Sequence, residues 1–150
     1  MSEVELRTHS AAHVVKGAVQ KVLGAKWTAS VHVSGSHGRL VVQFDRMPTD
    51  DELSRIEQAV NEKVSEGAEV LEFEMERQEA EGHFGDAIYD LFPVPSEVTL
   101  LKIVRIPDWN INCCNESHVE NTGEIGEIRL GKPRFRNSKR ELEIEFDLAD

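Results

Sequence analysis

Two pairs of side chains that commonly bind metal ions share one spacing in this sequence. His9 and His13 are four residues apart, and so are Cys114 and His118. Residues four apart on a helix lie one above the other, so both imidazoles of the first pair can reach one ion. Three imidazoles and a thiolate form a ligand set that suits Zn²⁺ in tetrahedral geometry. The spacing therefore predicts one zinc ion per chain, held by these four residues.

The same residues also have an ordinary structural interpretation. His9 can start a helix, His13 can pack inside the protein, and Cys114 can be a buried thiol. The spacing alone does not decide between a metal site and this alternative, so the residues around each pair have to be considered.

The context of both pairs resembles the editing domain shared by alanyl- and threonyl-tRNA synthetases. In that family an HxxxH helix and a CxxxH segment leading into Thr-Gly-x-Ile-Gly bind one zinc ion, and residues 8–13 and 114–126 have these features in this order. The likeness extends over most of the chain, including the Gly35-Ser36 loop and the segment 51–64. At 150 residues, without synthetase or tRNA-acceptor modules, the chain resembles the short, free-standing alanyl-tRNA editing proteins (AlaX type).

The resemblance implies a hydrolase that cleaves the ester joining a mischarged amino acid to the terminal ribose of tRNA, with serine on alanine-specific tRNA as the expected substrate. A synthetase pocket rejects a slightly different small amino acid by only a few kcal/mol, and a second hydrolytic site remedies this. The implied substrate contacts are Gly35, Ser36 and Thr122. Alanyl enzymes commonly have Gly-Gly-Thr between the Cys and the His, whereas this chain has residues 115–117 reading Asn-Glu-Ser, which indicates a differently shaped loop beside the metal.

Two arrangements of the metal are compatible with the sequence. If His9, His13 and Cys114 bind zinc while His118 does not, the open position can hold a water of lowered pKa. If all four residues bind, the site is closed and reads as structural. No catalytic residue beyond the zinc site is assigned, because the neighbouring glutamates at 116, 120 and 124 fit a solvated acidic face.

Three other functions are alternatives to this one. The chain could be a zinc-stabilised module that binds tRNA without hydrolysis, or it could remove serine from threonine-specific tRNA. A zinc metalloprotease is disfavoured, because Ser10 follows His9 where the H-E-x-x-H motif needs a glutamate as its base.

The charge distribution is uneven and bears on a tRNA partner. The net charge is −11, with balances of +3 over residues 1–40, −12 over 41–98 and −2 over 99–150. Phosphate contacts act within about 8–10 Å, so a local basic site on an acidic protein is permissible. One stretch of nine residues holds five basic side chains and no acid, and it is a candidate contact for the tRNA backbone or else a solvated hairpin tip: Lys132, Arg134, Arg136, Lys139 and Arg140.

Hydrophobic periodicity indicates the elements that must position these residues. Helical spacing predicts helices over 8–23 and 51–64, the second behind a capping box that begins at Thr49. Alternating apolar residues predict strands near 31–34, 40–44, 71–76, 99–106, 110–113 and 141–148, the last within a hairpin. The prediction is an α+β fold of two layers, in which a mostly antiparallel sheet carries both main helices on one face. Residues 1–150 are predicted to form one domain.

Composition sets the remaining expectations. Hydrophobic residues make up 39% and charged residues 30% of the chain, which is typical of a globular protein with a core. There is no run of about 18 apolar residues and no apolar segment in the acidic N-terminus, so neither a membrane span nor a signal peptide is expected. Two adjacent cysteines fit reduced thiols and a cytoplasmic location. No protein partner is evident, and monomer and homodimer remain equally open.

Overall fold

The first helix, α1 (Glu3–Leu23), is long and carries the predicted histidine pair. The computed structural model describes residues 2–149. Ser2 caps the helix by accepting a hydrogen bond from the backbone N–H of Glu5, and Gly24 ends it in the left-handed conformation (φ 72°). The helix begins five residues before the predicted start at Thr8, because Ser2 and the acidic first turn form a favourable N-terminus.

The second helix, α2 (Asp50–Glu66), confirms the predicted segment over 51–64. The capping box is present, since the Thr49 hydroxyl accepts from the backbone of Glu52 and the Glu52 carboxylate accepts from the backbone of Thr49. Ile56, Val60 and Val64 are buried along one face, which packs toward α1.

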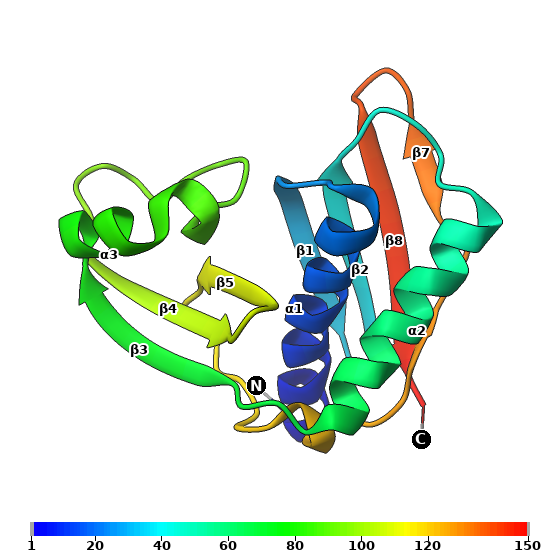
Figure 1. Ribbon diagram of the computed structural model, residues 1–150, viewed down its shortest axis with the longest axis horizontal. Helices are drawn as coiled ribbons and strands as arrows, with labels where there is room; N and C mark the ends of the chain where they lie inside the picture. The colour runs from blue at the N-terminus through cyan, green and yellow to red at the C-terminus, as the bar shows by residue number, and fades with distance from the viewer. Residues whose placement is uncertain (1, 150) are drawn as a thin grey trace.

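The larger sheet has five antiparallel strands. Its order is β1-β2-β8-β6, and β7 also pairs with β8, which confirms the predicted hairpin at the end of the chain. Figure 1 shows α1 and α2 packed over one face of this sheet. The strands are β1 (Thr28–Ser34), β2 (His37–Gln43), β6 (Ile128–Leu130), β7 (Arg134–Arg136) and β8 (Glu141–Leu148).

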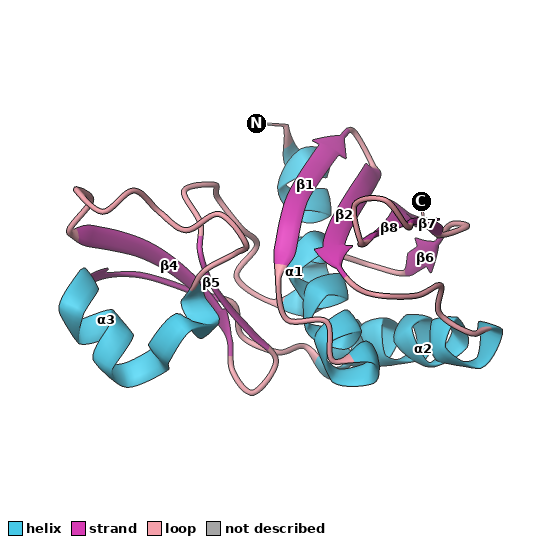
Figure 2. Cartoon of the chain, turned by 90° about the horizontal axis from the view of Figure 1, so that it is seen from above, coloured by secondary structure: helices cyan, strands magenta, loops and turns pink. Residues whose placement is uncertain are grey.

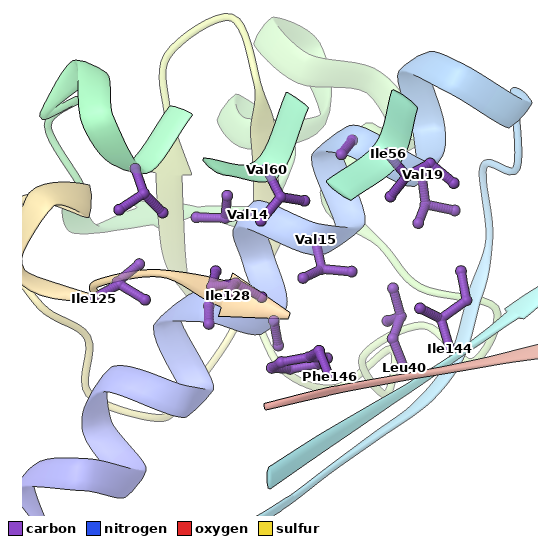
Figure 3. Packing of buried hydrophobic residues seen from close by; sticks show 14 of the residues in the cluster. Val14, Val15, Val19, Leu40, Ile56, Val60, Ile125, Ile128, Ile144 and Phe146 are labelled. Carbon is purple, nitrogen blue, oxygen red and sulfur yellow. The ribbon is translucent and has the colours of Figure 1, made fainter. Parts of the chain in front are cut away.

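The main core lies between these two helices and the larger sheet (Figure 3). It joins residues of α1 such as Val15, residues of α2 such as Val60, and sheet residues such as Leu40, Ile144 and Phe146. All five are completely buried. Burial of this apolar surface fixes α1 against the sheet, and so fixes the helix face on which the histidines lie.

A second, smaller sheet forms a separate layer to one side of α1. Its strands are antiparallel in the order β3-β4-β5, and it packs on a short helix through a core of its own. Figures 1 and 2 show it beside the larger sheet, with β5 next to α1 at the junction. The elements of this layer are β3 (Leu71–Glu76), α3 (Arg77–Phe84), the 3-10 helix η1 (Gly85–Ile88), β4 (Leu100–Ile106) and β5 (Asn110–Cys113). The 3-10 helix η2 (Thr122–Glu124) lies instead against α2 and α1.

These observations confirm the predicted α+β class with antiparallel strands. The strands are divided between two sheets, because β1 ends the larger sheet and β5 ends the smaller one without pairing to each other. Within residues 2–149, no helix combines the length and the apolar character needed to cross a membrane.

Candidate metal centre

The four predicted ligands come together at one point. His9 and His13 lie on successive turns of α1, whereas Cys114 follows β5 and His118 lies on the loop beyond it. One ligand atom from each residue lies within 4.8 Å of the others. The Sγ of Cys114 is 3.2 Å from the Nε2 of His9, and the Nε2 of His118 is 3.2 Å from the Nε2 of His13.

Two of the imidazoles are oriented by acceptors on their other ring nitrogen. The Nδ1 of His13 is 3.0 Å from the side-chain oxygen of Asn110, and the Nδ1 of His118 is 2.8 Å from a carboxylate oxygen of Glu72. Amide and carboxylate oxygens accept hydrogen bonds, so each Nδ1 carries the proton and each Nε2 presents a lone pair. Two lone pairs that face each other across 3.2 Å are unfavourable unless a cation lies between them.

The donor set fits a zinc ion. Zinc lies about 2.0–2.3 Å from nitrogen and sulfur ligands, which places tetrahedral ligand atoms about 3.3–3.6 Å apart. The two 3.2 Å separations are close to that spacing. Imidazoles whose far nitrogen donates to a carboxylate or carbonyl are typical of metal centres, and Glu72 and Asn110 supply such acceptors. The residues present are therefore suited to hold zinc.

Burial sets the charge state of the cluster. It lowers the pKa of His9 and lowers the pKa of His13 well below its usual range, and the neighbouring His118 adds to both shifts. Burial also raises the pKa of the Cys114 thiol. The two imidazoles are thus kept neutral, as metal ligands must be, while the thiol needs a nearby cation to lose its proton.

Backbone contacts explain why residues a hundred positions apart meet here. The backbone N–H of Cys114 donates to the carbonyl of Lys102 (2.9 Å), which keeps the residue in line with the end of β5. The backbone N–H of Val119 donates to the hydroxyl of Ser10 (2.9 Å), which ties the loop after His118 to α1. Ser10 lies between the two helical ligands, so one hydrogen bond sets the loop against both.

A small cavity of about 150 Å³ opens beside the cluster. Three of the four ligands line it, namely His9, His13 and Cys114, whereas His118 does not. The remaining polar lining comes from α1, β1, β5 and the segment after η1, and consists of Lys16, Thr28, Ser30, Asp90 and Asn112.

None of these five polar residues was identified from the sequence. Lys16 and Asn112 had a local signal, because Lys16 follows His13 by one helical turn and Asn112 precedes Cys114 by two residues in the strand direction. Thr28 and Asp90 had none, since the tertiary fold alone brings them to the cavity. The hydroxyl of Thr28 is buried and has no hydrogen-bond partner among the described residues.

The predicted substrate contacts lie elsewhere. Gly35 and Ser36 form the turn between β1 and β2, where the Gly35 carbonyl accepts from the Thr8 hydroxyl, and they do not line the cavity. Thr122 is completely buried, and its hydroxyl donates to the carbonyl of Lys63 and accepts from the N–H of Ala68. The predicted contact of Thr122 with substrate is therefore unsupported, because both hydrogen bonds of the hydroxyl serve the end of α2.

The basic cluster predicted to contact tRNA lies on the far side of the larger sheet from the cavity. Its five residues are exposed, and Arg136 pairs with Glu143 (3.0 Å). Two strands separate β7, which carries two of the five residues, from β1 at the cavity wall, so the two strands are about 14 Å apart at about 4.8 Å per strand. The cluster comprises Lys132, Arg134, Arg136, Lys139 and Arg140.

Comparisons with known proteins indicate the family to which the chain is related. Residues 101–141 match the family described as the threonyl and alanyl tRNA synthetase second additional domain. The chain is 36% identical over 126 residues to an alanine–tRNA ligase of Saccharolobus islandicus, covering 83% of the chain, and 37% identical over 133 residues to one of Methanopyrus kandleri, covering 87%. It spans 14% of the length of each ligase. The predicted resemblance is thereby confirmed: the chain is related to the part of alanine–tRNA ligases that contains this second additional domain.

Proposed function

We propose that the chain hydrolyses the ester of mischarged aminoacyl-tRNA, and that its substrate is serine esterified to alanine-specific tRNA. One zinc ion is held by His9, His13, Cys114 and His118. The relation to alanyl-tRNA synthetases supports a role in tRNA editing. The observation that carries the finer proposal is the meeting of four metal-binding atoms within 4.8 Å at the wall of a small cavity.

The residues of the chain divide between holding the metal and facing the substrate. Bound zinc supplies Lewis acidity toward the groups that it contacts. Asn110 and Glu72 hold the rings of His13 and His118 in the tautomer that a metal needs. His118 lies behind the cavity, and the other three ligands face it. A substrate in the cavity therefore meets the side of the cluster formed by His9, His13 and Cys114.

The cavity suits a small polar amino acid. Its volume of about 150 Å³ equals that of roughly five liquid water molecules, which leaves room for a small aminoacyl group. The buried Thr28 hydroxyl lacks a protein partner there. A serine hydroxyl can pair with it, whereas an alanine methyl leaves it unpaired at a cost of about 1–3 kcal/mol. This difference favours removal of serine and sparing of alanine.

The substrate test compares three charged tRNAs with zinc-loaded protein. We expect release of serine from alanine-specific tRNA to be faster than release of alanine by about 10-fold or more, and we expect Thr28→Val to reduce this preference. Faster release of serine from threonine-specific tRNA than from alanine-specific tRNA would show that the threonine-specific tRNA carries the true substrate. Binding of each tRNA without release of any amino acid would show a binding module and contradict the proposal.

A further inference from the structure

One wall of the cavity is an ionic network of two buried residues and one partly exposed carboxylate. Lys16 of α1 is 5% exposed and Asn112 of β5 is 2% exposed. The ammonium of Lys16 donates to the Asp90 carboxylate and to the side-chain oxygen of Asn112 (2.6 Å), and the amide of Asn112 donates to Asp90 (2.9 Å). Three residues from separate segments thus hold one another beside the metal cluster.

The carboxylate of Asp90 keeps one oxygen free of these contacts. Both hydrogen bonds use Oδ1, and no donor among residues 2–149 pairs with Oδ2. The Asp90 side chain is 40% exposed, compared with 6% for its partner Lys16. Its position is fixed because the next residue, Leu91, donates its backbone N–H to the carbonyl of Thr28 (2.9 Å) at the start of β1.

We infer that Asp90 binds the protonated α-amino group of the aminoacyl ester, with Lys16 and Asn112 as positioning residues. This inference rests on the proposed function. Asp90 is the one carboxylate among the described residues that line the cavity. The amino group lies on the carbon next to the ester carbonyl, so in a cavity this small it must meet the wall beside the metal cluster.

The network holds this carboxylate in a fixed position, as a cation site requires. A buried ammonium needs a charged partner, and Lys16 obtains one by holding Oδ1. The same contact holds the side chain of Asp90 through Oδ1 at the cavity lining and leaves Oδ2 available to another donor. The site therefore selects esters of α-amino acids over esters of similar size that lack the positive charge.

The test uses two esters on the same alanine-specific tRNA, the seryl ester and its α-hydroxy analogue, in which a hydroxyl replaces the amino group at nearly equal size. Hydrolysis by the zinc-loaded chain is measured below about pH 7, where an α-amino group with a pKa of about 7.7–8.0 is protonated. Loss of one charge-assisted hydrogen bond predicts about 10- to 100-fold slower hydrolysis of the α-hydroxy ester.

Asp90→Asn tests the residue, because asparagine keeps an acceptor for Lys16 and removes the charge. We expect this variant to hydrolyse both esters at rates within about 3-fold of each other. Asp86→Asn is the matched control, since Asp86 forms a lysine ion pair with Lys26 (2.8 Å) on the surface, outside the cavity. It should keep the full preference for the seryl ester.

The outcomes separate this inference from the function on which it rests. Equal hydrolysis of both esters by the unmodified chain would overturn the role of Asp90 and leave the proposed function intact. An equal slowing of both esters in Asp90→Asn would show a structural role and would also overturn it. Hydrolysis of neither ester by zinc-loaded chain would contradict the proposed function itself. If Asp90→Asn does not fold, the comparison of esters on the unmodified chain still decides.

Discussion

Gly17 sits where α1 presses against Trp109, and a methyl group there should disturb both stability and the metal centre. A Cβ built on Gly17 would lie 2.4 Å from two indole atoms and 2.8 Å from the backbone oxygen of Trp109. The indole N–H donates to the carbonyl of Val14 (2.9 Å). In Gly17→Ala the indole must move, which breaks this hydrogen bond.

The expected change follows from three opposing effects. Overpacking costs about 1–3 kcal/mol. Loss of the indole hydrogen bond costs about 0.5–1.5 kcal/mol, and the better helix propensity of alanine returns about 1 kcal/mol. We expect a net loss of about 0.5–3.5 kcal/mol in the free energy of unfolding. Each kcal/mol lowers Tm by about 2–4 °C in a chain of this size. Zinc affinity should fall too, since Trp109 adjoins Asn110, which orients His13.

Urea unfolding of zinc-free protein measures the loss of stability, and competition with a chelator measures the loss of zinc affinity. Gly82→Ala is the matched control, because Gly82 lies in α3 with nothing within 4 Å of its Cβ position. Alanine there should stabilise the protein by about 0.5–1 kcal/mol. If Gly17→Ala were as stable as Gly82→Ala, close packing of Trp109 on α1 would be refuted.

Three further predictions concern the metal, the tyrosine and the basic cluster. With free zinc at 100 times its Kd, bound zinc should raise the free energy of unfolding by about 2.7 kcal/mol, and a chelator should remove this gain. Calorimetry with and without chelator checks this, and in His13→Ala the chelator should have no effect. Burial, with the hydrogen bond to Glu81, raises the pKa of Tyr89 to about 12. This stabilisation is complete below about pH 10 and is lost as the pH rises to about 12; tyrosinate absorbance of this single tyrosine checks it, and a midpoint near 10 in folded protein would contradict it. Charge reversal at Arg134 and Lys139 should weaken tRNA binding and reduce the slope of log affinity against log salt by about 2, and an unchanged slope would exclude the cluster as a phosphate contact.

The sequence was informative wherever function depends on local spacing. The four-residue separation of His9 and His13 predicted a shared face of α1, and the capping box at Thr49 predicted where α2 begins.

Features that depend on tertiary contacts were out of reach of the sequence. No local pattern shows that Asp90, on an irregular segment, meets Lys16 seventy-four residues earlier. Nor does alternation of apolar residues say which strands pair, so one sheet was predicted where β1 and β5 end two separate sheets. Thr122 was assigned from a motif, and only its burial shows that its hydroxyl serves the end of α2.

The most direct test of the central proposal is a zinc titration of ester hydrolysis. Metal-free protein receives zinc in steps, and release of serine from alanine-specific tRNA is measured at each step beside the bound zinc, with alanyl-tRNA as the reference. We expect serine release to rise in proportion to bound zinc and to level off at one ion per chain, while alanine stays attached. Serine release that is complete without zinc, or absent from folded protein with one zinc ion bound, would contradict the proposal.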